Sequence, residues 1–179
     1  MKAWHFVDEK LRDGRPVPPD GTWLKHDGEL VMCESGLHAS KRLIDALKYA
    51  PGNTICRVKV GGDIVEDDDK LVASKRKIMW RIDGEQVLRA FARWCALQVV
   101  HLWDAPDVVI EYLTTGNEEI EDAASCAAWY AARSAERDAV WDAASYTTWD
   151  AHNTQLELMV REARDGRTRW TLEVPERKS

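Results

Sequence analysis

The side chains with the clearest chemical potential lie in one stretch, residues 33–52. Glu34, His38 and Tyr49 are the candidate catalytic residues. A histidine can act as a base or as a substrate ligand near neutral pH, and a tyrosine ring can stack on a ligand. Ser35 lacks the Gly-x-Ser-x-Gly pattern of an activated serine, which favours a turn serine. Structural roles also account for His38 and Tyr49, so the sequence offers a candidate site without assigning any catalytic residue.

The pattern around these residues predicts the end of a strand, a glycine turn and a short helix. We expect Ser40 to cap this helix through its hydroxyl, and Pro51-Gly52 to end it. Apolar residues recur at three- and four-residue steps between these two signals. They predict one buried helix face, formed by Leu43, Ala46, Leu47 and Ala50.

Alternating apolar residues on both sides of this stretch predict a small, mainly antiparallel sheet. We expect strands at residues 3–7, 23–24, 54–60 and 78–82, and a turn at Gly61-Gly62-Asp63 followed by a return strand at 64–66. The acidic run 67–69 does not have the spacing of a calcium loop. The cysteines and histidines do not have zinc-ligand spacing. We therefore expect no metal site.

The composition changes at Asp83, which is a good helix cap, and the remaining chain is predicted to be mainly helical. Apolar residues at helical spacing predict helices over 84–103 and 106–113, and Gly116 is expected to end the second. Residues 165–166 should end a last helix. Residues 166–179 are expected to form a terminal strand or a frayed tail.

From Ala123 the sequence repeats every four residues, with alanine leading most repeats. Since an α-helix has 3.6 residues per turn, a row with this spacing drifts by about 40° per repeat around the helix. A row that drifts cannot stay against one flat partner, so the helix is expected to wrap, to break into a hairpin or to pack on more than one neighbour, with residues 146–148 as a candidate break. Core packing and partner contact both stay open for its tryptophans. The candidate partner-binding residues hold one repeat position: Trp129, Arg133, Arg137, Trp141 and Trp149.

The overall composition limits the classes of partner and the compartment. The chain has 179 residues, a formal net charge of −6 and a pI near 5.4, so nucleic-acid binding is disfavoured. The two local basic runs, residues 75–77 and 161–169, are interpreted as solvated faces. Four widely spaced cysteines predict free thiols in a reducing cytosol, and no apolar run is long enough to span a membrane.

Several stretches together resemble an uncharacterised family of small bacteriophage and prophage proteins. They are LRDGRPVPPDG (11–21), CESGLHASKRLIDALKYAPG (33–52), DDKLVASKRKIMW (68–80) and LRAFARWCALQVVHLWDAP (88–106). The resemblance implies a phage origin, with the host cytoplasm as the compartment, and implies no activity. SGLHAS followed by Ala46 and Tyr49-Ala50 is also similar to a segment of ADP-ribosyltransferase-like folds. That likeness would add His5 and Glu66 to a nicotinamide-dinucleotide site.

These observations predict an α+β fold with an α+β domain at 1–82, a helical region at 83–165 packed on it, and the terminal segment 166–179. The preferred function is a noncatalytic phage accessory protein that binds a protein partner, such as a host or host-defence factor, without a cofactor. The alternatives are a nucleotide- or NAD-using enzyme with a site at residues 34–49, and a structural phage protein. A homo-oligomer also stays open.

Overall fold

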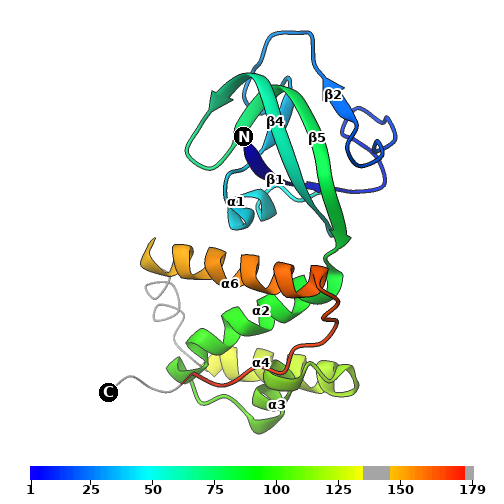
Figure 1. Ribbon diagram of the computed structural model, residues 1–179. Coiled ribbons are helices and arrows are strands. Elements are labelled where there is room, and N and C mark those ends of the chain that lie inside the picture. The colour runs from blue at the N-terminus through cyan, green and yellow to red at the C-terminus, as the bar shows by residue number, and fades with distance from the viewer. Residues whose placement is uncertain (135–145, 176–179) are drawn as a thin grey trace. The chain divides into compact units, whose positions relative to one another are not determined.

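The computed structural model describes residues 1–134 and 146–175, which belong to two compact units, Met1–Glu85 and Gln86–Ser179 (Figure 1). The described part of the N-terminal unit holds a mainly antiparallel sheet, and that of the C-terminal unit is helical, so the predicted α+β class is confirmed. Among the described helices, none is both long and apolar enough to cross a membrane.

The described residues of the N-terminal unit form one five-stranded sheet in the order β1-β4-β5-β2, with β3 also paired to β5. A long hairpin of β4 and β5 dominates it. On its free side, β5 pairs first with β3 and then with β2, and each pairing between strands is antiparallel. The strands are β1 (Lys2–Val7), β2 (Trp23–Lys25), β3 (Leu37–Ala39), β4 (Thr54–Glu66) and β5 (Leu71–Asp83).

The sheet closes on itself through Ser40, the residue that follows β3. Its backbone N–H and carbonyl exchange two hydrogen bonds with Trp4 of β1, with N···O distances of 2.9 and 2.7 Å. Hydrogen bonding therefore runs from β1 through β4, β5 and β3 back to β1, around a small apolar interior. The buried residues that pack there are Ala3, Val7, Ala39, Cys56, Val58, Val60, Leu71, Ala73 and Ile78.

Strand alternation places two basic residues on the same inner face as this interior. His5 lies between Ala3 and Val7 in β1. Arg76 lies two residues before Ile78 in β5, opposite Val60 of β4. The strand geometry thus directs an imidazole and a guanidinium toward the interior of the sheet.

Two local predictions in this unit are wrong. Ser40 does not cap the short helix α1 (Leu43–Leu47), because its backbone is committed to Trp4; the N-cap residue is Arg42, without a side-chain cap. The chain does not reverse at Gly61-Gly62-Asp63 either. β4 continues past a register irregularity there, and the hairpin reverses in the acidic run, where the Asp67 N–H donates to the Lys70 carbonyl.

The helical predictions for the C-terminal unit are largely confirmed. Asp83 accepts a hydrogen bond from the Glu85 N–H at the start of α2, and Gly116 ends α3 in the left-handed conformation. The described elements are α2 (Glu85–Val99), η1 (Val100–Leu102), α3 (Asp107–Thr115), η2 (Glu118–Ile120), α4 (Glu121–Ser134) and α6 (Tyr146–Arg164). One apolar cluster of this unit contains Leu97, Val100, Val109, Leu113 and Ala124.

The terminal segment was predicted to be either a strand or a frayed tail, and its described part does not form a strand. Residues 167–175 have no regular secondary structure. The segment is nonetheless held in place, because the Leu172 N–H donates to the Thr114 carbonyl at 2.8 Å and the side chain of Trp170 is buried. Its described part is therefore anchored to the end of α3.

Candidate anion-binding site

A cavity of about 800 Å³ in the N-terminal unit brings the candidate site residues together. Glu34, His38 and Tyr49 all line it, although they come from a loop, from β3 and from the turn after α1. Ser35 and His5 line the same cavity. The structure thus gathers the polar residues of the 33–52 stretch around one space and adds the first strand to them.

Arg76 is the most unusual lining residue, because it is a buried cation. Its side chain is only 5% exposed. One terminal nitrogen, Nη1, donates to the His38 carbonyl, whereas Nε is buried without a hydrogen-bond partner. Within the described part of the chain, no carboxylate forms an ion pair with Arg76. Burial lowers the pKa of Arg76 to about 10, which leaves the guanidinium charged at neutral pH.

His38 holds the loop that precedes β3. Its Nε2 accepts a hydrogen bond from the Cys33 N–H at 2.9 Å, which requires an unprotonated Nε2. Burial lowers the pKa of His38, and a backbone hydrogen bond with Gly36 partly opposes that effect. With Nε2 occupied by the loop backbone, the ring acts here as a positioning group, and a role as general base would require this bond to break.

The loop held by His38 has a constrained backbone. Cys33 adopts a positive φ of 66°, which is rare for a residue other than glycine, and the Arg12 guanidinium donates to its carbonyl at 3.0 Å. Gly36 has a φ of 112°, and a Cβ there would lie 2.4 Å from a methyl carbon of Val72. The loop is therefore fixed by several independent contacts, and its glycine cannot readily be replaced.

His5 lines the same cavity as Arg76 and is kept neutral. Burial lowers its pKa well below the usual value, and the positive charge of Arg76 and the neighbouring His38 act in the same direction. An anion bound between these groups would reverse the electrostatic part of this effect. The proton affinity of His5 is therefore expected to respond to a bound ligand.

Tyr49 marks the rim of the cavity. Its ring is 51% exposed, and its hydroxyl donates to Asp69 at 2.8 Å. The Lys70 ammonium lies 5.0 Å from the ring centre, and a hydrogen bond with the Cys33 side chain, then one with Tyr49, raises the pKa of Lys70. These contacts fix the orientation of an exposed aromatic ring beside the opening.

The lining of the cavity carries a surplus of positive charge. The described residues around it include six lysines and arginines but three carboxylates, in a chain whose net charge is −6. The carboxylate of Asp13 is already paired with Arg15 at 2.6 Å. The cations are Lys10, Arg12, Arg15, Lys25, Lys70 and Arg76, and the acids are Asp8, Asp13 and Glu34. The arrangement suits an anionic ligand.

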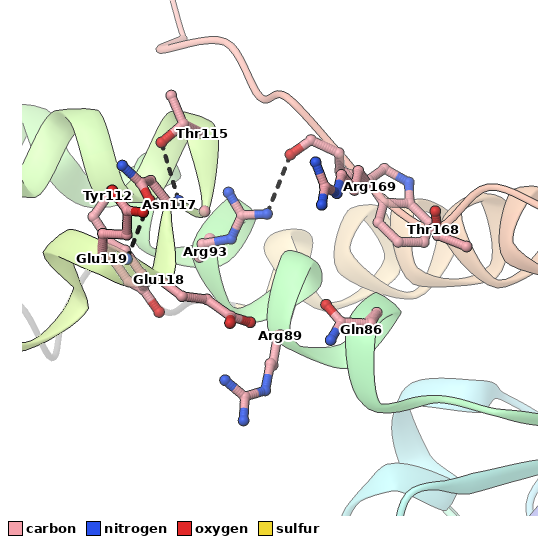
Figure 2. Close-up of a pocket in the computed structure, with 12 residues that line it drawn as sticks. Gln86, Arg89, Arg93, Tyr112, Thr115, Asn117, Glu118, Glu119, Thr168 and Arg169 are labelled. Atoms are coloured by element: carbon pink, nitrogen blue, oxygen red, sulfur yellow. Dashed lines mark hydrogen bonds between the residues drawn. The ribbon is translucent and has the colours of Figure 1, made fainter.

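A second cavity, of about 720 Å³, lies in the C-terminal unit, and Arg93 stands at its centre (Figure 2). The two terminal nitrogens of Arg93 donate to the Leu113 and Trp170 carbonyls at 3.0 and 3.2 Å. Figure 2 shows the guanidinium between the end of α3 and the segment with Thr168 and Arg169. Its bonds explain how the terminal segment is anchored, so we assign Arg93 a structural role.

The predicted partner-binding residues lie mostly outside the part of the chain that the structure describes. Trp141 and Arg137 lie outside the described residues, and the side chains of Trp129 and Arg133 are likewise outside the described part of α4. Trp149 lies in the first turns of α6 and is half-buried. The partner surface therefore stays a prediction.

Sequence reasoning missed Arg76 as a site residue. It belongs to the basic run 75–77, which was interpreted as solvated, yet Arg76 shares its strand face with Ile78. Extending the alternation of residues 78–82 backward by one step would have placed Arg76 inside. His5 was expected at a site only through the ADP-ribosyltransferase likeness, although strand alternation also places it on the same face as Ala3 and Val7.

The N-terminal unit is a small α+β domain with a cavity whose described lining carries more cations than carboxylates. The chain belongs to the family described as "Domain of unknown function (DUF7666)", which matches residues 1–90 and therefore includes the whole N-terminal unit. No curated protein and no solved structure matches the chain.

Proposed function

We propose that the N-terminal unit binds a phosphate-bearing small molecule of the nucleotide type in the cavity around Arg76. The observation that carries this proposal is the buried guanidinium with no carboxylate partner among the described residues. An unpaired buried charge is costly, and a bound phosphate would supply the missing negative charge. The planar guanidinium is also well suited to phosphate oxygens.

The proposal is one of binding rather than of catalysis. Nε2 of His38 accepts from the backbone of its own loop, and the Tyr49 hydroxyl donates to Asp69. Neither group is positioned to take a proton from a ligand in this arrangement.

Calorimetric titration of the full chain tests the proposal, with inorganic phosphate, pyrophosphate, adenosine monophosphate and nicotinamide adenine dinucleotide as separate probes. We expect at least one probe to bind, and Arg76→Met to weaken that binding by about tenfold or more, since charge-assisted hydrogen bonds are lost. Circular dichroism checks that the variant is folded. Absence of heat at millimolar concentrations of all four probes would refute the proposal.

Two arginines of one loop supply a matched comparison. Arg12 contributes its charge to the cavity and donates to the Cys33 carbonyl, whereas the charge of Arg15 is already paired with Asp13. Arg12→Gln should therefore weaken binding of the probe more than Arg15→Gln does. Equal effects of the two variants would mean that only the overall charge of the loop matters, against a defined site.

A second candidate function is the phage accessory role, with a protein partner bound through the alanine–tryptophan repeat. Its specific support is that Trp149 is only half-buried, although it lies seven residues before the buried Leu156 and therefore on the same face of α6. A pull-down from the bacterial host, compared between Trp149→Ala and the exposed control Leu158→Ala, tests it by mass spectrometry. A partner that both variants retain equally would remove Trp149 from the proposed surface.

A further inference from the structure

One face of the N-terminal sheet gathers lysines that are far apart in the sequence. The strand register places Lys2 opposite Lys59, Lys59 opposite Lys77, and Lys77 opposite Trp23. Directly opposed residues point to the same face of a sheet. Neighbouring strands are about 4.8 Å apart, so this row of three lysines and one tryptophan crosses four strands over about 14 Å.

A second row runs beside the first. Lys75 is two residues from Lys77 and therefore shares its face, and it lies opposite Lys25 of β2 and Gly61 of β4. We call these six residues the lysine face: Lys2, Trp23, Lys25, Lys59, Lys75 and Lys77. All are exposed except Lys77, which is half-buried. Within the described part of the chain, none of the five lysines forms an ion pair with a carboxylate.

Trp23 lies across this face. Its ring is 39% exposed, and the Lys77 ammonium lies 5.1 Å from the ring centre. A Cβ on Gly61 would lie 3.8 Å from Cη2 of Trp23, so the indole reaches over β5 to the adjacent strand β4 (the three strands lie side by side in Figure 1). The lysine face therefore contains an accessible aromatic surface among its cations.

The arrangement is unfavourable for an isolated sheet. Like charges directly opposite each other on neighbouring strands repel, and the row places three lysines in this relation without acidic residues between them. A phosphate backbone would relieve that repulsion and would release condensed counterions on binding. An exposed indole can in addition stack on any unpaired base.

We propose that the lysine face binds single-stranded nucleic acid, with phosphates on the lysines and a base stacked on Trp23. A duplex would satisfy the lysines but would leave Trp23 without an unpaired base. The proposal goes beyond the small-molecule site, because the row of Lys2, Lys59, Lys77 and Trp23 lies on the sheet face opposite to Arg76, and Lys25 alone of the lysine face also lines the cavity. The net charge of −6 disfavours nucleic acid for the chain as a whole, whereas this surface is a local concentration of positive charge.

Fluorescence anisotropy with the full chain and labelled oligothymidine, oligouridine and a hairpin duplex tests the proposal over a series of salt concentrations. We expect the single strands to bind and their affinity to fall with salt. Combining Lys59→Gln with Lys77→Gln should weaken binding and lower the slope of log K against log salt by about 1.4, the value for two phosphate contacts to a single strand. The matched control combines Lys41→Gln with Lys48→Gln, whose lysines already pair with Glu66 and Asp69.

Trp23 tests whether the lysine face binds single strands by stacking on an unpaired base. Trp23→Ala should weaken single-strand binding by about tenfold without changing the salt slope, since it removes stacking but no charge. Val65→Ala, which shortens another exposed apolar residue, is its control. The proposal is overturned if no oligonucleotide binds at low salt, if the lysine variants match their control, or if Trp23→Ala has no effect. Tighter binding of the duplex than of the single strands overturns it as well.

Discussion

The two units of this chain bury different kinds of side chain. Among the described residues, the buried polar or charged side chains are Ser40, Asp45 and Arg76, and all three lie in the N-terminal unit. The buried side chains described in the C-terminal unit are apolar, from Val87 to Trp170. Burying a charge costs free energy that a hydrophobic core does not incur. The comparison therefore favours ligand recognition in the N-terminal unit.

The charged side chains of the two units also differ in how their charges and hydrogen-bond donors are satisfied. Asp45 lies 3.6 Å from both Arg42 and Lys48, so its buried charge is balanced locally. Arg93 in the C-terminal unit uses its donors to anchor the terminal segment. Arg76 differs from both, because among the described residues it has no carboxylate partner, and its hydrogen bond from Nη1 to the His38 carbonyl leaves the buried Nε without a partner. It is the feature that structure alone leaves unexplained and that a ligand would explain.

The largest expected effect is on the C-terminal core. Phe91 is buried, stacks on Trp94 at a centroid distance of 5.9 Å and contacts His152 edge-on. Phe91→Ala should lower the free energy of unfolding of this unit by about 3–5 kcal/mol, the usual cost of an aromatic cavity. Urea denaturation with hydrogen exchange at α2 and β4 measures each unit separately.

Leu158→Ala is the control for this substitution, because Leu158 is an exposed residue of α6 and should change stability by less than about 0.5 kcal/mol. If Phe91→Ala lowered the hydrogen-exchange protection of α2 and β4 equally, the two units would unfold as one. The two units could then not be treated as separately stable.

The next effect compares two glycines with similar backbone angles. Gly36 in the N-terminal unit has a φ of 112° and Gly166 in the C-terminal unit a φ of 102°. A methyl group at Gly36 would collide with Val72 and Leu30, whereas one at Gly166 meets nothing within 4 Å. Gly36→Ala should therefore cost about 1–3 kcal/mol more than Gly166→Ala in thermal or urea unfolding, the price of overpacking added to a shared backbone strain. Equal losses would show that the loop before β3 can move away from Val72.

Local sequence patterns were sufficient to predict the fold class and the long elements. The alternation at 54–60 and 78–82 predicted parts of β4 and β5, and apolar residues at helical spacing predicted α2. The closure of the sheet was not predictable in this way. The closure depends on backbone pairing between Trp4 and Ser40, and nothing in the sequence around either residue indicates that the two will pair. The same pairing explains why Ser40 does not cap α1 as expected.

The candidate site was also predictable only in part, because local patterns reveal some of its residues and long-range pairing determines the others. Glu34, His38 and Tyr49 belong to one stretch and could be found by type and spacing. Arg76 and the lysine face depend on register, which brings together residues that are distant in the sequence. Net charge concealed the lysine face, because it averages over a surface on which positive and negative regions are separate.

A smaller effect concerns pH. Burial lowers the pKa values of His5 and His38 in the N-terminal unit, and that of His152 in the C-terminal unit. Because the unfolded chain binds protons more readily at these sites, stability is lost as the pH falls below about 6.5. The loss is at most about 1.4 kcal/mol per pH unit for each histidine, and it should be steeper in the N-terminal unit.

Hydrogen exchange at β4 and α2 between about pH 7 and pH 5 measures this difference. His5→Gln should bring the pH dependence of the N-terminal unit close to that of the C-terminal unit. His101→Gln, which changes an exposed histidine of η1, should leave both unchanged. An unaltered slope in His5→Gln would mean that carboxylates rather than the His5 imidazole control the acid sensitivity.

The smallest effect is a difference in the rates at which cysteine thiols are labelled, which reports on the opening of each unit. Each unit has one exposed cysteine, Cys33 or Cys126, and one less accessible cysteine, Cys56 or Cys95, and all four are free thiols. Burial raises the pKa values of Cys56 and Cys95 to about 11, so few of their thiols are ionised near neutral pH. A disulfide reagent should therefore label the exposed pair promptly and the other pair only when a unit opens, as mass spectrometry of peptides resolves. Phe91→Ala should then accelerate labelling of Cys95 while leaving Cys56 at its original rate, and Gly36→Ala should do the reverse. Acceleration of both thiols by either substitution would show that the units share one opening event. The contrast between the proposed N-terminal recognition unit and a separately stabilised helical unit would then have to be given up.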